Sequence, residues 1–233
     1  MQGILRPVNT VLKLESPYLD RREAGRALAA CLRGEDLGKE PLVLALPNGG
    51  VPVGAEVAEA LDLPLEVFIV RKLGVPGYPE VAMGALASGG VQLLDDALIA
   101  SLGLKPTEVA AVINREIDEL RRQEQVYRPR RMLSLGWRPA ILIDDGLATG
   151  FTMRAAIAAL RRTGCPRITV AVPVGAEDVC AEFARDVDML VCPLQPEIFD
   201  AVGRWYEDFH PTSDEEVQAC LARVSRAHGG TAL

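Results

Sequence analysis

Two adjacent carboxylates end an apolar run in the segment Ile141-Leu-Ile-Asp-Asp-Gly-Leu-Ala-Thr-Gly-Phe-Thr-Met153. A buried strand over Ala140 to Ile143 would leave Asp144 and Asp145 at its carboxyl end, where carboxylates need water, a cation or hydroxyl donors. A glycine-containing loop then enters a helix, so the backbone N–H groups of Ala148 to Thr152 can converge on an anion beside the helix's positive end. This pattern is typical of a site for a phosphate monoester, with the acids placed to bind a neutral diol nearby.

A phosphate-binding loop beside diol acceptors indicates a ribose 5-phosphate site. The segment is neither a P-loop, which needs G-x-x-x-x-G-K-[ST], nor a G-x-G-x-x-G fingerprint. A structural interpretation stays open at this point, in which the aspartates cap the loop and the glycines only turn the chain. The combination of four apolar residues, two acids, G-x-x-T-G-x-T and a following helix favours binding.

The elements that must position this segment alternate between apolar strands and amphipathic helices, which predicts an α/β fold with a largely parallel sheet. The expected strands are Leu42–Leu46, Leu65–Val70, Ala140–Ile143, Ile168–Val172 and Val187–Val191, with a hairpin of Val81–Ala87 and Val91–Leu94. The expected helices run from the cap Asp20 to about Arg33 and over Val51–Leu61, Pro106–Tyr127, Phe151–Arg162, Glu177–Arg185 and Asp214–Ala227. Ligands of such sheets bind beyond the carboxyl ends of the strands, so the loops Pro47–Gly50, Arg71–Glu80, Asp144–Gly150 and the segment after Val191 are the candidates.

At this point the sequence resembles the type I phosphoribosyltransferases, whose motif for phosphoribosyl pyrophosphate has the same apolar-acid-acid-G-x-x-T-G-x-T form. Pro47-Asn48-Gly49-Gly50 is similar to the family's pyrophosphate loop, and Arg71-Lys72 to the basic pair that opens its mobile catalytic loop, here Gly74–Glu80. The likeness extends over most of the chain, including Y-L-D-R-R-E-A-G near its start and W-Y-E-D-F near its end. It implies a three-layer fold with a mostly parallel central sheet, a mobile catalytic loop and a small hood. Residues 1–233 would form one domain, with the hood built from the N- and C-terminal segments.

The resemblance also implies an activity: transfer of ribose 5-phosphate from phosphoribosyl pyrophosphate to a nitrogenous base, with release of pyrophosphate, by a Mg²⁺-dependent pentosyltransferase. Asp144 and Asp145 would hold the ribose hydroxyls directly or through metal-bound water, and Arg71 and Lys72 would stabilise the leaving group. Glu80 is the candidate general base, although a solvated surface glutamate is the simpler explanation of this residue. The residues implied to bind the two phosphate groups are Asn48, Gly49, Gly50, Gly146, Ala148, Thr149, Gly150, Phe151 and Thr152.

The sequence departs from the family's pattern at two positions. Asn48 stands where many relatives have Lys or Arg, which predicts weaker pyrophosphate binding or a cation supplied by the partner subunit of a homodimer. Ala148 stands where relatives acting on hypoxanthine or guanine have an aspartate, so the acceptor base is not identified. The aromatic cluster of Trp205, Tyr206 and Phe209 could stack on that base, or pack against the N-terminal segment.

The charge and composition exclude several classes of function. A formal net charge of −7 opposes binding to large anionic surfaces, and two histidines argue against most histidine-rich zinc sites. Five cysteines without C-x-x-C spacing, no signal peptide and no long apolar run predict a cytoplasmic protein that does not contact membranes.

The alternative function is a regulator that senses phosphoribosyl pyrophosphate and binds nucleic acid. Its basic run would be Arg121, Arg122, Arg128, Arg130 and Arg131. Cations that complement the end of a helix explain this run more simply. A second acid pair, Asp95-Asp96, is explained by a helix N-cap.

Overall fold

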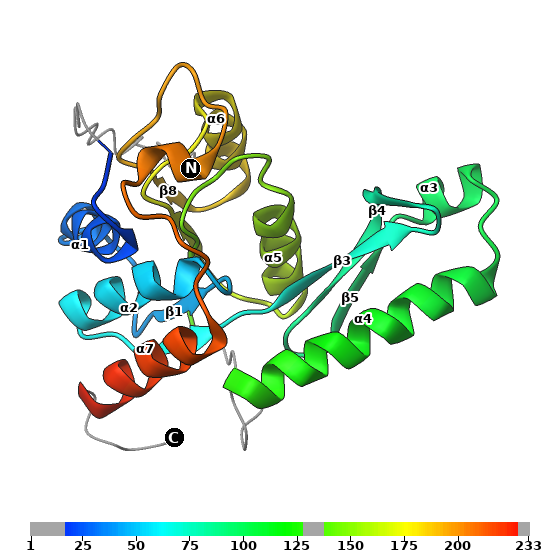
Figure 1. Cartoon of the computed structure of the whole chain (residues 1–233), viewed down its shortest axis with the longest axis horizontal. Coiled ribbons are helices and arrows are strands. Elements are labelled where there is room, and N and C mark those ends of the chain that lie inside the picture. Colours follow the sequence, from blue (N-terminus) through cyan, green and yellow to red (C-terminus); the bar gives the residue numbers. More distant parts are fainter. Residues whose placement is uncertain (1–16, 128–137, 228–233) are drawn as a thin grey trace.

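The computed structural model describes residues 17–127 and 138–227 and has a five-stranded parallel sheet at its centre (Figure 1). Its strands are β1 (Leu42–Ala45), β2 (Leu65–Val67), β6 (Ala140–Ile143), β7 (Ile168–Ala171) and β8 (Met189–Val191). Their order in space is β2-β1-β6-β7-β8, so the chain leaves β1 toward one edge and continues from β6 toward the other. The carboxyl ends of β1 and β6 therefore form the topological switch point, where ligands of open α/β sheets bind.

Helices cover both faces of this sheet, because its strands are apolar on both sides. Val43, Ala45 and Ile141 pack on one face with the buried sides of α1 (Arg21–Leu32), α2 (Gly50–Leu61) and α7 (Asp214–Ala227). Leu42, Leu44 and Leu142 pack on the other face with α5 (Phe151–Arg162) and α6 (Glu177–Asp186). The expected three-layer α/β fold with a mostly parallel sheet is confirmed.

A second, antiparallel sheet forms an arm that extends away from the parallel sheet (Figure 1). Its strands are β3 (Val70–Val75), β4 (Tyr78–Ala87) and β5 (Val91–Leu94), followed by α3 (Asp96–Ser101) and the long α4 (Pro106–Tyr127). The predicted hairpin between Val81 and Leu94 is therefore correct, and β4 begins three residues earlier than expected. The predicted strand Leu65–Val70 ends at Val67, and Val70 already belongs to β3.

Residues 74–80, which we expected to form a mobile catalytic loop, form the end of a β-hairpin in the structure. Gly74 lies where the pairing register between β3 and β4 shifts, and a Cβ there would lie 2.7 Å from the Pro79 carbonyl oxygen. Pro76 and Gly77 occupy the two-residue turn, and Gly77 has a φ of +83°, which a Pro-Gly turn requires at its second central position. The glycines and prolines thus mark a bulge and a tight turn.

Chain segments from both ends of the described structure meet above the parallel sheet. Tyr18 forms a parallel bridge with Tyr206, and the Tyr18 N–H donates to the Trp205 carbonyl at 2.9 Å. The residues from Tyr206 to Ser213, which we call the strap, follow the short 3-10 helix Val202–Trp205 and lead into α7. Within the described ranges, no helix has the length and apolar character needed to span a membrane.

Candidate active site

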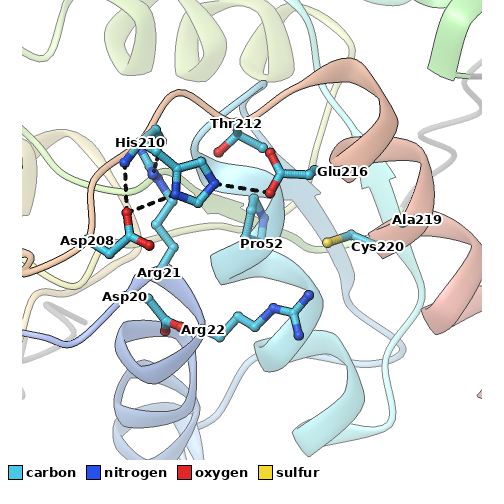
Figure 2. A pocket seen from close by; sticks show the side chains of 10 residues that line it. All are labelled: Asp20, Arg21, Arg22, Pro52, Asp208, His210, Thr212, Glu216, Ala219 and Cys220. Atoms are coloured by element: carbon cyan, nitrogen blue, oxygen red, sulfur yellow. Dashed lines mark hydrogen bonds and ion pairs between the residues drawn. The ribbon is translucent and has the colours of Figure 1, made fainter.

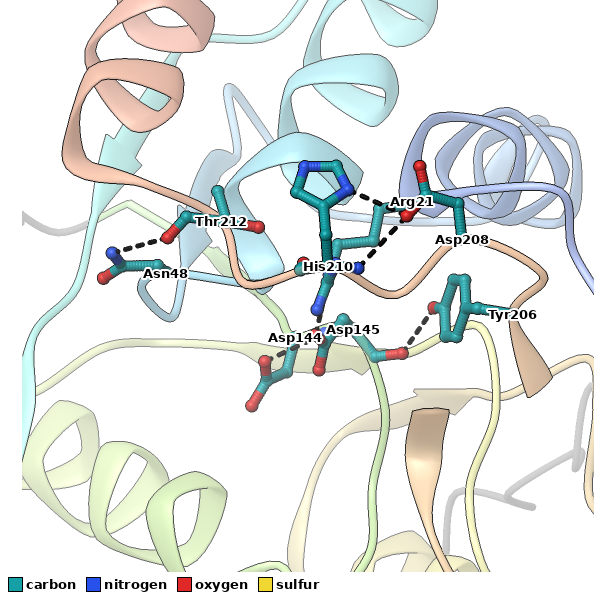
Figure 3. A network of polar contacts seen from close by, with 8 residues as sticks. All are labelled: Arg21, Asn48, Asp144, Asp145, Tyr206, Asp208, His210 and Thr212. Carbon is teal, nitrogen blue, oxygen red and sulfur yellow. Dashed lines mark hydrogen bonds and ion pairs between the residues drawn. The ribbon is translucent and has the colours of Figure 1, made fainter. Parts of the chain in front are cut away.

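Asp144 and Asp145, the acid pair, follow β6 directly and lie half-buried at the switch point. The Asp145 N–H donates to Asp144 Oδ1 at 2.9 Å, which ties the two neighbouring acids to each other (Figure 3). Tyr206 donates its hydroxyl proton to the Asp145 carbonyl at 2.6 Å, which joins the strap to the acid pair. The acid pair is therefore held at the strand end by backbone contacts before any ligand is present.

The P-N-G-G loop (Pro47–Gly50) follows β1 and packs against the acid pair. A Cβ on Gly49 would overlap the Asp145 carboxylate, and a Cβ on Gly50 would lie 2.8 Å from Asp144 Cα. Only glycine allows this approach, because any side chain would separate the two loops. The structure thus brings together the two loops that the sequence assigned to one site.

The loop from Asp144 to Gly150, here called the phosphate loop, leads into the N-terminus of α5. Its Leu147 N–H donates to the Val174 carbonyl at 2.9 Å, and Gly150 has a left-handed φ of +70°. The first N–H groups of a helix have no intrahelical acceptor, so the start of α5 presents donors and positive potential to this edge of the sheet. Thr149 is exposed there and Thr152 is exposed as well. These are the requirements for binding a phosphate monoester.

The two acids differ in their electrostatic surroundings. Burial and the negative charge of Asp145 raise the pKa of Asp144 well above its usual range. Burial also raises the pKa of Asp145, but Arg21 opposes that rise through its charge and its hydrogen bond. Asp144 is thus the acid that most needs a cation or hydroxyl donors from outside the protein.

Arg21, which our sequence reasoning did not identify as a site residue, contacts the acid pair directly. Its Nε donates to Asp145 Oδ2 at 2.9 Å, and its Nη1 donates to the His210 carbonyl at 2.8 Å (Figure 3). A signal for it was present in the sequence. A cation at the start of a helix opposes the helix dipole, so an arginine directly after the cap Asp20 requires another partner.

Asn48 takes part in a polar network that turns its side chain toward α4 and α7. Its Nδ2 donates to the Thr212 carbonyl at 3.0 Å and to Asp214 Oδ1 at 3.2 Å. The Tyr127 hydroxyl lies 2.9 Å from Asn48 Oδ1 and 2.6 Å from Asp214 Oδ1. Burial and the hydrogen bond to Asp214 raise the pKa of Tyr127. The Asn48 amide is therefore occupied. The Gly50 N–H donates to the Leu46 carbonyl at 3.1 Å, so the N–H groups of Asn48 and Gly49 are the backbone donors that the P-N-G-G loop can offer a ligand.

The predicted catalytic residues Arg71, Lys72 and Glu80 lie on the arm. Arg71 forms an ion pair with Glu116 of α4, with an N–O distance of 2.7 Å, and the Lys72 ammonium donates to the Glu80 carbonyl at 3.3 Å. Within residues 17–127 and 138–227, no hydrogen bond or ion pair joins these three residues to either loop of the site. The expectation that Arg71-Lys72 opens a loop is corrected, since both residues belong to β3.

The aromatic cluster packs internally, as the second of the two sequence interpretations proposed. The Tyr206 ring centre lies 5.7 Å from that of Tyr18 and 5.1 Å from that of Phe209, and Tyr206 is buried. The Arg21 guanidinium lies 3.9 Å from the centre of the Phe209 ring. The rings of Tyr206 and Phe209 are thus packed against other residues of the protein.

Three further sequence interpretations can be compared with the structure. Arg121 and Arg122 pair with Asp118 and Glu119 on their own helix, whereas residues 128–131 of the basic run lie outside the described residues. Asp95 caps α3 through the Leu98 N–H, as expected. The five cysteines are free and buried.

A separate pocket of about 130 Å³ lies between α1, α2, the strap and α7 (Figure 2). His210 lies at its edge and bridges Asp208 and Glu216, with ring nitrogen–oxygen distances of 2.8 and 3.1 Å. The hydrogen bonds to Asp208 and Glu216 raise the pKa of His210. The acid pair does not line this pocket. The pocket is therefore distinct from the loops at the switch point.

A divalent cation fits the donor set at the acid pair only as a partly hydrated ion. Within the described residues, no group of three or more His, Cys, Asp or Glu side chains could enclose a metal. Asp144 has no cationic partner there, and carboxylate oxygens are the hard ligands that Mg²⁺ prefers. Mg²⁺ binds through one or two carboxylates together with water and substrate phosphates, and this donor set matches that mode.

Comparisons with known proteins agree with this geometry. The family model for the phosphoribosyl transferase domain matches residues 18–192. A protein provisionally named a phosphoribosyl transferase occurs in two strains of Mycobacterium tuberculosis and is 45% identical over 208 residues, or 89% of this chain. The match covers 47% of that protein, so the chain spans about half the length of the curated relatives it matches. The crystal structure of TT1426 from Thermus thermophilus is similar over 89% of this chain and 98% of that one, with 37% identity and a TM-score of 0.78.

Proposed function

The chain belongs to the phosphoribosyl transferase domain family, and from that premise we propose that it transfers ribose 5-phosphate from phosphoribosyl pyrophosphate to a nitrogenous base. The single observation that carries the proposal is the contact of the acid pair with the P-N-G-G loop at the β1/β6 switch point, beside the N-terminus of α5. The identity of the acceptor base stays open.

In this proposal each part of the donor has its own loop. Backbone N–H groups of Ala148 to Thr152, with the hydroxyls of Thr149 and Thr152, bind the 5′-phosphate. The backbone of Asn48, Gly49 and Gly50 binds the pyrophosphate, and the acid pair lies beside the ribose hydroxyls, whose hydrogen bonds Asp144 accepts. Each hydrogen bond to a charged group contributes about 1.5–3 kcal/mol, so the phosphate loop supplies much of the affinity.

Mg²⁺ would be held by the acid pair, chiefly by Asp144, together with donor oxygens and water. When bound, it would neutralise charge on the pyrophosphate. The protein's own part is to orient the ribose over the acid pair and to exclude water from the reacting carbon.

The reaction breaks the bond between C1′ and the pyrophosphate oxygen through an oxocarbenium-like state, and the nitrogen of the base adds from the opposite face. Arg71 and Lys72 are proposed to stabilise the charge on the leaving group, and Glu80 to act as the base. Because all three lie on the arm, these roles require the end of the arm to approach the bound donor.

We expect Lys72→Ala to lower kcat more than it raises KM, since leaving-group charge grows in the transition state. An effect confined to KM would contradict the role of Lys72.

Binding of phosphoribosyl pyrophosphate tests the proposal directly. Titration calorimetry with Mg²⁺ should show binding to the wild type and none to the double variant Asp144→Asn/Asp145→Asn. Asp118→Asn, which removes an exposed carboxylate of α4, is the matched control and should bind normally. Unchanged affinity in the double variant would refute the proposed site.

Release of pyrophosphate during a screen of nitrogenous bases would identify the acceptor. Donor binding without release for any base, together with a salt-dependent gel shift of RNA, would instead support the regulator. Light scattering of the wild-type protein should show a dimer. We propose a dimer because the P-N-G-G loop has no cation of its own, and a partner subunit could supply one.

A further inference from the structure

Arg21 and Asp145 form an ion pair that is fixed from several sides. The side chains of Arg21 and Asp145 are 10% and 16% exposed, and Nε lies 2.9 Å from Oδ2. The guanidinium is also held by the His210 carbonyl and lies over the Phe209 ring. A carboxylate committed in this way has little freedom to turn toward a ligand.

Asp144 has the opposite character. Among the described residues no Lys, Arg or His forms an ion pair with it, and its one backbone hydrogen bond comes from the Asp145 N–H. Figure 3 shows its carboxylate directed away from Arg21 and from the strap. An ionised carboxylate held at a strand end without a cation is unfavourable unless a ligand supplies hydroxyl donors or a metal ion.

The ion pair also lies directly against the P-N-G-G loop. A Cβ on Gly49 would overlap the Asp145 carboxylate and would lie 3.3 Å from Arg21 Nε. Asp145 thus contacts α1 through Arg21, the strap through Tyr206 and the P-N-G-G loop through Gly49. Its carboxylate joins α1 to the P-N-G-G loop, and its backbone carbonyl binds the strap.

From these contacts we propose that the two acids have different tasks. Asp144 is the carboxylate that contacts the ribose hydroxyls or metal-bound water. Asp145 is a positioning residue, whose charge Arg21 neutralises and whose ion pair fixes the P-N-G-G loop. The identity of the ligand rests on the proposed function, whereas the ion pair and its effect on the loop do not.

Removing one partner of a buried ion pair leaves an uncompensated charge, whereas removing both is tolerated. We therefore expect Arg21→Met and Asp145→Asn each to lower Tm by roughly 5 °C or more. The double variant Arg21→Met/Asp145→Asn should recover most of that loss. Additive losses in the double variant would overturn the ion pair as a coupled unit.

Ligand binding separates the two acids. Calorimetry with phosphoribosyl pyrophosphate and Mg²⁺ should show a loss of about tenfold or more for Asp144→Asn, as expected for a lost charge-assisted contact. Arg21→Met should also weaken binding, because the uncompensated Asp145 repels the phosphates. In the double variant Arg21→Met/Asp145→Asn, affinity should return to within about threefold of the wild type. If Asp145 contacts the ligand itself, the double variant will bind no better than either single variant, and the proposal falls.

Arg22→Met is the matched control, because Arg22 is the exposed neighbour of Arg21 and makes no hydrogen bond or ion pair with another described residue. Arg22→Met should change neither Tm nor donor affinity. Arg21→Lys should lose less Tm and less donor affinity than Arg21→Met. Failure of the wild type to bind the donor would overturn the proposed function and the ligand-facing task of Asp144. The unfolding measurements, which need no ligand, would still confirm or overturn the ion pair.

Discussion

In the parallel sheet, the acid pair is held by neighbours from several separate segments, whereas in the arm Arg71 and Lys72 are held by partners within the arm itself. Asp145 contacts α1, the P-N-G-G loop and the strap. Arg71 pairs with Glu116 of α4, and Lys72 with the carbonyl of Glu80. Groups held from several segments are pre-organised for binding, while a region with its own internal contacts can move as a unit without breaking them. From this difference we propose that ground-state binding of the donor belongs to the parallel sheet and any closing step to the end of the arm.

Replacing a glycine in each region should show the largest contrast. A Cβ at Gly50 would lie 2.8 Å from Asp144 Cα and from the Ile143 carbonyl oxygen, so backbone must shift. We expect Gly50→Ala to cost about 3 kcal/mol in the free energy of unfolding and to abolish donor binding. Gly77, at the turn of the arm, has no atom within 4 Å of its hypothetical Cβ. Gly77→Ala should cost only about 1 kcal/mol, from its positive φ, and leave donor affinity unchanged.

Urea unfolding and calorimetry measure both glycine variants. Normal donor affinity in a folded Gly50→Ala protein would show that the close approach of the two loops is not needed for binding. Weakened affinity in Gly77→Ala would show that the arm contributes to the ground state.

Loss of the arm's internal ion pair should have a smaller effect. Glu116→Gln removes the charge that pairs with Arg71, in a pair that is partly exposed. We expect a cost of about 1–2 kcal/mol in urea unfolding. Asp118→Asn on the same helix is the control, because Asp118 is 80% exposed and should change stability by less than about 0.5 kcal/mol. Equal effects of the two variants would mean that Arg71 is not anchored in solution.

Tyr127 connects the arm to the sheet region and offers a finer test. Tyr127→Phe removes the hydroxyl that contacts Asn48 and Asp214, which should cost about 1 kcal/mol. Because Asn48 belongs to the P-N-G-G loop, donor affinity should fall several-fold as well. Tyr78→Phe, on the exposed end of the arm, should leave both quantities unchanged. A Tyr127→Phe protein with lower stability and normal affinity would show that the two regions are not coupled through Asn48.

The smallest expected effect concerns His210 on the strap. Its pKa is raised by Asp208 and Glu216. Hydrogen bonds from His210 lower the pKa of Asp208, and hydrogen bonds from the Ser213 N–H and from His210 lower the pKa of Glu216. The histidine's contribution is therefore complete below its unfolded pKa of about 6.5 and disappears as pH rises through its higher folded value. The acids' contributions are complete above about pH 4.3 and disappear at lower pH, and nearby Arg21 adds a further positive charge. The Tm difference between wild type and His210→Gln should therefore be largest between about pH 5 and 6.5. A difference that does not vary with pH would exclude these ion pairs in solution.

Much of the site could be predicted from the sequence because its signals are local. The apolar run before Asp144 predicted β6, and its limits and those of α5 agree with the structure. The glycines of the P-N-G-G loop and the G-x-x-T-G-x-T pattern predicted two ligand-binding loops at strand ends. The resemblance of these motifs to the type I phosphoribosyltransferases agrees with the family to which the chain belongs.

The residues that the sequence misassigned depend on pairing between distant segments. Gly74, Pro76 and Gly77 have the same local preferences in a loop and in a bulged hairpin, and only the pairing of β3 with β4 distinguishes the two. Arg21 reaches Asp145 across 124 positions of sequence, which no periodicity can indicate.

By itself, the sequence determined the alternation of strands and helices, the two loops and the acid pair, because hydrophobic period and glycine placement act over a few residues. Only the tertiary structure decided that Arg21 forms an ion pair with Asp145 and that Asn48 turns toward Tyr127. It also decided that Arg71 and Lys72 belong to an arm. The physical reason is that charges and amides select their partners among the groups that the folded chain brings within hydrogen-bonding distance.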